Sequence, residues 1–318
     1  MILDERHTMK RNPLLASVAA IALLGLAGCG DDSDPLTAET DSGEESSGAE
    51  LVVGSANFPE NALLAEIYAG ALEGAGVEAS TRPNIGSRET YLPGLLDGSI
   101  DVFPEYTGVL RDYFAVESDA EVTGTEPDEV YEELKTVLPE ELTALGFSEA
   151  EDKDAVVVTQ ETADEYSLTS IGDLAPVAGD LTLGGPPEWK TRSTGVPGLE
   201  KLYDVSFGDF IELDAGGPLT LRALVNGRID AGNLFSTDPN IAAEDLVVLE
   251  DPESLFAAQN VVPLLRTEVV TPEVTTALED VSDALDTETL GELVTRVVID
   301  KEDPEDVAEE FLDQAGLS

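Results

Sequence analysis

Short apolar runs alternate with longer segments in which apolar residues recur every three or four positions. Residues 51–54 form the first run, and the first periodic segment is 60–72. Its apolar stripe is typical of one helix face and consists of Leu63, Leu64, Ile67, Tyr68 and Leu72. Residues 77–81 are predicted as a second strand. This alternation indicates an α/β fold with a mostly parallel sheet, in which ligands bind beyond the carboxyl ends of the strands.

A second series of the same kind begins at residue 155. Its strands are predicted at 155–159, 181–183, 229–230 and 246–249. A later apolar run at 260–265 is predicted to return to the first series, because helices alone follow it. These helices are expected near 272–285, 287–299 and 304–315, and Asp303-Pro304-Glu305 is a typical helix start.

The segment from Glu50 to Ser318 is longer than one hydrophobic core usually holds, so two lobes are expected. Lobe I is predicted to comprise 51–154 together with 255–318, and lobe II to comprise 155–254. The chain would then cross between the lobes twice. Two such crossings form a hinge, with a ligand cleft between the lobes.

An internal echo relates the two halves. Gly98-Ser99-Ile100-Asp101 precedes Tyr106-Thr107 by the same offset at which Gly227-Arg228-Ile229-Asp230 precedes Phe235-Ser236. Each lobe would therefore present one aromatic ring where a strand ends. Two units that share a common helix-turn-strand pattern, with both rings in the core, would produce the same echo.

The first residues indicate export. A short basic region that opens with Met9-Lys10-Arg11 precedes an apolar segment at 14–26 that is too short to span a bilayer, and Leu26-Ala27-Gly28-Cys29 resembles the lipobox of bacterial lipoproteins. We expect 1–28 to be a signal peptide, Cys29 to be lipidated and 29–49 to be a disordered tether. The protein would then be anchored to the outer face of the cytoplasmic membrane by its lipid alone. An ordinary signal peptide with an incidental cysteine is the alternative.

The charge is strongly negative, because 67 Asp and Glu outnumber 16 Lys and Arg and give a formal net charge of −51. Such self-repulsion is tolerated in halophiles, so a salty exterior is expected. A generally acidic surface without functional meaning explains the charge equally well if the organism is not halophilic. Either way, nucleic acid is excluded as a partner, since its phosphates require a basic footprint.

Residue types needed for common catalytic sites are scarce. The single histidine, His7, lies in the predicted signal peptide, and the single cysteine is Cys29. This excludes a Ser-His-Asp triad, a Cys-His pair and an imidazole metal site from the predicted mature domain. Neither a Walker loop nor an EF-hand loop occurs. We therefore expect no enzyme activity, no cofactor and no metal.

Six short blocks occur in an order that resembles a known family. They are GSANF at 54–58, GSRE at 86–89, GSID with PEYTG at 98–108, LGGPPE at 183–188, DAGGPLT at 214–220 and FSTD at 235–238. Together they are similar to the substrate-binding proteins of osmoprotectant ABC importers, the glycine betaine, choline and carnitine group. The resemblance spans 51–312. It implies a two-lobe type 2 periplasmic-binding-protein fold that closes on its ligand by hinge motion and delivers it to an ABC permease. We expect the protein to be a monomer.

The resemblance also implies a site. A quaternary ammonium has no N–H to donate, so aromatic faces select it, each contributing about 0.5–2 kcal/mol. By position Tyr106 matches the cage tyrosine of lobe I, Phe235 stands where lobe II usually has a tyrosine, and Arg192 matches the carboxylate-binding arginine. The other expected site residues are Asn57, Thr107, Asp154, Trp189 and Asp238.

Structural roles compete for several of these residues. Trp189 is also explained by packing, Arg192 by a surface ion pair, and Asn57 and Asp238 by helix capping.

Several positions depart from the family pattern. Ala56 replaces a frequent lysine, Val109 a hydroxyl residue and Leu221 a cage tyrosine, while Asp154 occupies or adjoins an aromatic position. Trp189 and Gly195 stand where some relatives carry a cysteine pair. The cage is thus thinner than in the usual pattern, and Asp154 would supply counter-charge, which favours choline or another net cation over betaine.

Two other function classes remain open. The first is a binding protein for an amino acid or an oxyanion, in which helix N-termini and hydroxyl groups would replace the rings. The second is an enzyme on the same fold. Hydroxymethylbilane synthase fails as that enzyme, because it attaches its cofactor through a cysteine and the predicted mature domain offers none.

Overall fold

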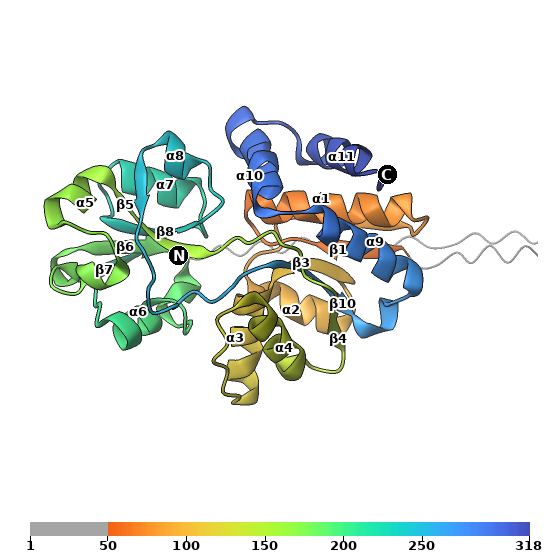
Figure 1. The fold of residues 1–318 in the computed structure, drawn as a ribbon, viewed down its shortest axis with the longest axis horizontal. Helices are drawn as coiled ribbons and strands as arrows, with labels where there is room; N and C mark the ends of the chain where they lie inside the picture. The colour runs from red at the N-terminus through yellow and green to blue at the C-terminus, as the bar shows by residue number, and fades with distance from the viewer. Residues whose placement is uncertain (1–49) are drawn as a thin grey trace, which may run out of the picture. The chain divides into compact units, whose positions relative to one another are not determined.

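Two five-stranded sheets organise the chain (Figure 1). The structure, a computed structural model, describes residues 50–318, which belong to one unit, Ser47–Ser318. The predicted signal peptide, Cys29 and the tether lie outside the described residues. The first sheet has the order β2-β1-β3-β10-β4, and the second has the order β7-β6-β8-β5-β9.

The first sheet and its helices are named lobe I here, and the second sheet and its helices lobe II. The strands of lobe I are β1 (Leu51–Gly54), β2 (Ala79–Arg82), β3 (Val102–Tyr106), β4 (Leu142–Ala144) and β10 (Val261–Arg266). The strands of lobe II are β5 (Asp154–Thr159), β6 (Thr182–Gly185), β7 (Asp209–Glu212), β8 (Ala231–Phe235) and β9 (Leu246–Val248).

Helices cover both sheets. Those of lobe I are α1 (Pro59–Gly74), α2 (Arg88–Asp97), α3 (Thr107–Ser118), α4 (Pro127–Val137), α9 (Pro272–Ala284), α10 (Thr287–Thr295) and α11 (Pro304–Ala315). Those of lobe II are α5 (Gln160–Tyr166), α6 (Val196–Tyr203), α7 (Pro218–Val225) and α8 (Asn240–Ala243). The helix predicted over 287–299 is shorter than expected, because a π-helical turn, η5 (Arg296–Asp300), follows α10.

The prediction of mostly parallel sheets is wrong in part. Each sheet has a parallel core, β2-β1-β3 in lobe I and β7-β6-β8 in lobe II. The remaining pairings are antiparallel, because β10 and β5 each enter their sheet from the opposite lobe. Periodicity in the sequence identifies a strand but not the direction in which it runs.

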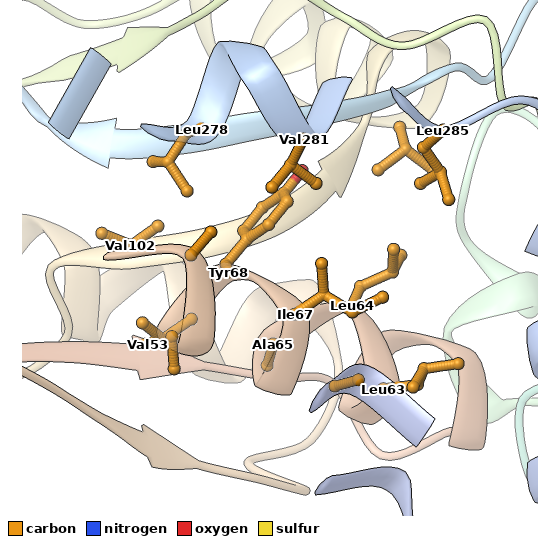
Figure 2. Close-up of a cluster of buried hydrophobic side chains, with 14 of the residues drawn as sticks. Val53, Leu63, Leu64, Ala65, Ile67, Tyr68, Val102, Leu278, Val281 and Leu285 are labelled. Atoms are coloured by element: carbon orange, nitrogen blue, oxygen red, sulfur yellow. The ribbon is translucent and has the colours of Figure 1, made fainter. Parts of the chain in front are cut away.

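The α1 helix anchors the core of lobe I. Pro59 stands in its first turn, where the missing N–H costs nothing. Its apolar stripe faces β1, β3 and α9, so that Leu63, Leu64 and Ile67 have no exposed surface (Figure 2). Tyr68 packs in the same cluster with Leu278 and Val281 of α9. The predicted helical stripe is thereby confirmed.

The two chain segments that cross between the lobes are bonded to each other. The N–H of Asp152 donates to the carbonyl of Gln259 at 3.1 Å, and the N–H of Val261 donates to the carbonyl of Ala150 at 2.9 Å. Glu151 and Asn260 form an isolated antiparallel bridge between these contacts. The crossings, 145–153 and 249–260, therefore form a paired connection between the sheets.

The echo seen in the sequence is a structural repeat. A carboxylate oxygen of Asp101 accepts the N–H of Val52 at 2.9 Å, and one of Asp230 accepts the N–H of Thr182 at 2.7 Å. In each lobe this bond ties the start of the central strand to its parallel neighbour. The central strands β3 and β8 then end on Tyr106 and Phe235.

We predict that Leu63→Ala lowers the free energy of unfolding by about 2–5 kcal/mol, because it leaves a cavity under α1. Urea denaturation at fixed salt measures this change. Leu96→Ala is the matched control, since Leu96 is 48% exposed and should lose little. Equal losses in the two variants would contradict the assigned core.

Candidate ligand-binding site

A cavity of about 370 Å³ lies between the lobes at the ends of the strands. Its wall comes from loops that follow β1, β6 and β7 and from the last residues of β3 and β8. The volume is in the range that accommodates small-molecule ligands, roughly 300–1,000 Å³. The expectation that a ligand would bind beyond the carboxyl ends of the strands thus coincides with a real cavity.

Five aromatic residues line this cavity, and three of them form one group of neighbouring rings. Tyr106 and Phe235 come from β3 and β8, as the echo predicts. The third ring, Phe58, lies 6.2 Å from Tyr106 and 4.8 Å from Phe235, measured between ring centroids. In the sequence, Phe58 is marked only as a member of the GSANF block. Its position in the loop that follows β1 is the signal that could have identified it, because this loop begins at a strand exit, where the other two rings stand.

Asn61, in the first turns of α1, holds the loop that carries Phe58. The side-chain carbonyl of Asn61 accepts the N–H of Ala56 at 2.7 Å, and its amide donates to the carbonyl of Pro104 at 2.8 Å. Asn61 is only 1% exposed. Asn57, one of the predicted site residues, is thereby held at the exposed edge of the cavity.

Tyr106 is oriented by a carboxyl group. Its hydroxyl donates to Oε1 of Glu60 at 2.7 Å, and both side chains are buried. Burial raises the pKa of the Tyr106 phenol, and the neighbouring carboxyls of Glu60 and Asp152 raise it further. The phenol is therefore neutral and acts as a fixed donor, which holds the ring at the cavity wall.

Both arginines that line the cavity are already paired with carboxylates. Arg88 grips Glu105 through two bonds of 2.8 and 2.7 Å, and the hydroxyl of Tyr91 donates to the same carboxylate at 2.5 Å. Glu105 has no exposed surface. This buried pair joins α2 to β3 and leaves the guanidinium of Arg88 neutralised.

Arg192 bridges the lobes. It extends from lobe II to Glu89 on α2 of lobe I, with Nη2 3.0 Å from Oε2. Burial alone would raise the pKa of Glu89, but the hydrogen bonds and charge of Arg192 lower it to about 2. Arg192 thus lines the cavity and is also an ion-pair partner. The carboxylate of Glu89 occupies the place on Arg192 that was expected for the carboxylate of a ligand.

Asp154 presents a buried carboxyl at the start of β5. One of its oxygens accepts the amide of Asn233 at 2.7 Å, and burial raises its pKa. The side-chain oxygen of Asn233 has no hydrogen-bond partner among residues 50–318, although it is buried at the cavity wall. Asn233 could not be predicted as a site residue, because no motif in the sequence marks it.

Trp189 takes part in two environments. It is 1% exposed and stacks on Phe256 with ring centroids 6.1 Å apart, so most of its surface belongs to the core of lobe II. One edge also lines the cavity. The packing role weighed for Trp189 is therefore present in the structure.

Two predicted site residues lie outside this cavity. The hydroxyl of Thr107 donates to the carbonyl of Ala258 at 3.2 Å and accepts the N–H of Asn260 at 3.1 Å, which ties α3 to the second crossing. Asp238 accepts the N–H of Asn240 at 2.8 Å, as a turn residue does. Asp238 lines a separate cavity of about 210 Å³ on the other side of the Phe58 and Phe235 rings.

The cavity is acidic overall. Carboxyl groups of Asp152, Asp154, Glu188 and Asp214 line it. Its two arginines, by contrast, are paired with Glu89 and Glu105, which are not among the lining residues. In residues 50–318 no group of three or more His, Cys, Asp or Glu side chains is arranged to hold a metal ion.

Comparison with known proteins identifies the family. Residues 49–314 match the model of OpuAC, the substrate-binding domain of ABC-type glycine betaine transport systems. The chain belongs to this family. The resemblance inferred from the six blocks is thus confirmed, and members of the family serve as substrate-binding components of transport systems.

Individual relatives agree with this assignment. The glycine betaine-binding protein YehZ of Escherichia coli is 29% identical over 83% of this chain and 90% of its own length. The ergothioneine transport permease and binding protein EgtU of Helicobacter pylori is 26% identical over 84% of this chain and 48% of its own length. A crystal structure of a glycine betaine/carnitine/choline ABC transporter protein has a TM-score of 0.65 at 23% identity, covering 84% of this chain and 99% of that one. The two-lobe fold is thereby confirmed.

We predict that Arg88→Met lowers the free energy of unfolding by about 3–5 kcal/mol, because Glu105 is left buried without a counter-charge. Urea denaturation at neutral pH measures the loss. Lys135→Met is the control, since Lys135 pairs with Glu132 on the surface and its removal should cost far less. A loss in Arg88→Met no larger than that in Lys135→Met would contradict the buried ion pair.

Proposed function

We propose that this protein is an extracytoplasmic lipoprotein that binds a quaternary-ammonium compatible solute and delivers it to an ABC importer. The observation that carries the proposal is the group of three rings, Phe58, Tyr106 and Phe235, in an acidic cavity between the lobes. Aromatic faces attract a cation that has no N–H to donate. The family of the chain supports the same ligand class.

The charges of the cavity favour a ligand with net positive charge. Asp154 is buried and receives one neutral hydrogen bond, while Arg88 and Arg192 are both engaged by carboxylates of the protein. A ligand carboxylate would therefore have to displace Glu89 from Arg192. Choline avoids that cost, whereas glycine betaine and carnitine do not, so we propose choline or a similar cation as the preferred ligand.

The alternative of an oxyanion or amino acid fits the cavity less well. An oxyanion would meet four lining carboxyls and two neutralised arginines. An amino acid needs a free cation for its carboxylate, which the Arg192–Glu89 pair does not offer.

Ergothioneine, the ligand in the name of one relative, is itself a trimethylammonium compound and belongs among the candidates.

Anchoring is proposed from the sequence. The lipobox ends at Cys29, which lies outside the described residues. Among the helices of residues 50–318, none is long and apolar enough to cross a membrane. We propose that a lipid on Cys29 holds the protein at the outer face of the cytoplasmic membrane as a monomer.

We predict that Tyr106→Ala weakens binding of the preferred ligand by about tenfold or more, because it removes one face of the ring group. Calorimetric titration in high salt with choline, glycine betaine, carnitine, ergothioneine and ectoine measures this effect. Tyr106→Phe keeps the ring and should lose less. Tyr131→Ala is the control, since Tyr131 packs on Phe147 outside the cavity.

Two results would oppose the proposed function. Absence of heat with all five solutes would remove the ligand class. An unchanged affinity in Tyr106→Ala would move the ligand away from the rings and favour the oxyanion or amino-acid alternative.

We also predict that Glu89→Gln improves binding of glycine betaine relative to choline, because it frees Arg192 for the ligand carboxylate. The ratio of the two affinities should shift about three- to tenfold, since the arginine is partly solvated. Glu188→Gln is the matched control: it also removes one negative charge from the cavity region, but the bond of Glu188 to Arg192 is made by its backbone carbonyl and survives the substitution, and the Arg192 guanidinium bonds to Glu89. An equal shift in both variants would attribute the preference to the general field and not to Arg192.

A further inference from the structure

Beneath the rings, three side chains from different parts of the fold meet in a buried contact. Glu60 stands in the first turn of α1 in lobe I, Asp152 on the first crossing, and Thr237 just beyond β8 in lobe II. Oγ1 of Thr237 lies 2.7 Å from Oε2 of Glu60 and 2.9 Å from Oδ1 of Asp152. Glu60 is 4% exposed and Asp152 is 2% exposed.

Counting hydrogens shows that this contact requires an extra proton. A threonine hydroxyl has one hydrogen and can donate it to only one of the two carboxyl oxygens. The second short contact must therefore be donated by a carboxyl group to the threonine oxygen. Two arrangements satisfy these contacts: a proton on Oε2 of Glu60 is donated to Thr237, which donates to Asp152, or a proton on Oδ1 of Asp152 is donated to Thr237, which donates to Glu60.

The surroundings agree with one bound proton. Oε1 of Glu60 accepts the hydroxyl of Tyr106, and Oδ1 of Asp152 accepts the N–H of Thr237 at 3.0 Å. The charged groups that face Glu60 are Asp152, Asp238 and Lys301, and the last of these shares the smaller cavity with it. Burial raises the pKa of Glu60, and burial together with the charge of Glu60 raises the pKa of Asp152.

Opening of the lobes would break this arrangement at one point. Asp152 and Thr237 are joined through the backbone N–H of Thr237 and move together, whereas Glu60 is fixed to lobe I through α1 and Tyr106. The contact that crosses the cleft is the one between Glu60 and Thr237. In the open state both carboxyls meet water, and their pKa values fall toward about 4.

We propose that closure of the lobes on a ligand takes up a proton at the Glu60–Thr237–Asp152 contact. The proposal rests on the proposed function, since it concerns the same cleft. Glu60 is then a positioning residue, because it acts on the ligand through Tyr106 and through the lobe contact. The protein would hold its solute more tightly in an acidic medium than in an alkaline one.

The sign follows from the two states. The closed state binds the proton more strongly than the open state, so the affinity for ligand falls as the pH rises. Between the pKa values of the open and closed states the affinity changes by up to about tenfold per pH unit, for uptake of one proton. Below the open-state value the affinity is constant, because both states are protonated.

The test is calorimetric titration with choline, or with whichever of the five solutes binds, in two buffers of different ionisation enthalpy. The wild-type protein should take up close to one proton per ligand in the window above about pH 4. Glu60→Gln should abolish this uptake and flatten the pH profile, because a glutamine amide reproduces the protonated glutamate. Its carbonyl accepts from Tyr106 and its N–H donates to Thr237.

Glu66→Gln is the matched control. Glu66 lies on the same helix and also has a raised pKa, but its neighbours are Thr81, Asp303 and Glu305, away from the cleft. This variant should keep the wild-type proton uptake. The proposal is overturned if Glu60→Gln retains the wild-type uptake and pH profile, or if Glu66→Gln loses them equally.

A second measurement separates this proposal from the proposed function. In the closed state a carboxyl with a raised pKa makes folding less favourable as the pH rises past its unfolded value. At a saturating concentration of a solute that binds, the melting temperature of wild type should therefore fall relative to Glu60→Gln between about pH 5 and pH 8, whereas without ligand the difference should stay constant. A constant difference in the ligand-bound proteins would overturn the proton uptake although a solute binds. Binding of none of the five solutes would instead remove the proposed function, and this proposal with it.

Discussion

Within residues 50–318, two chain segments join the lobes, and they are bonded to each other at Asp152 and Val261. This narrow connection is the constraint on which the rest depends. Each lobe must complete its own core, so α1 and α9 close one around β1 and β3 while Trp189 fills another. The cleft between them must then be held by side chains alone. Three contacts do so: Phe58 on Phe235, Arg192 on Glu89, and Glu60 on Thr237.

These contacts depend on different physical forces, so each of them responds differently to salt and to pH. The ring contact is apolar and changes little with salt or pH. The Arg192–Glu89 pair is partly solvated, so salt screens it. The contact of Glu60 with Thr237 is buried and therefore responds to protons more than to salt. For a chain of net charge −51, this division matters, because its surroundings are rich in counter-ions.

Sequence periodicity predicts the elements of this fold well, and its failures have physical causes. The stripe on α1 and the start of α11 at Pro304 were predictable because burial and capping leave local patterns. The direction of β10 was not, since it depends on a partner in the other lobe.

The residues of the candidate site also fall into those that the sequence predicts and those that it does not. Tyr106 and Phe235 could be predicted by counting from Asp101 and Asp230. The pairing of Arg192 with Glu89 could not, because 103 residues separate them and the contact exists only in the folded cleft. Thr107 shows the opposite error, since its place in a family block concealed a role in holding the second crossing.

The repeated aspartate at the start of β3 and β8 has a consequence for how such clefts diversify. Asp101 and Asp230 fix the register of the central strand from its beginning, and the ring stands five residues later at its end. An exchange of the terminal side chain leaves that register intact, whereas an inserted residue would turn every following side chain to the opposite face. The strand therefore keeps a constant spacing between the aspartate and the last side chain. New ligand preferences can arise by substitution of that last residue without any change in the core of the lobe.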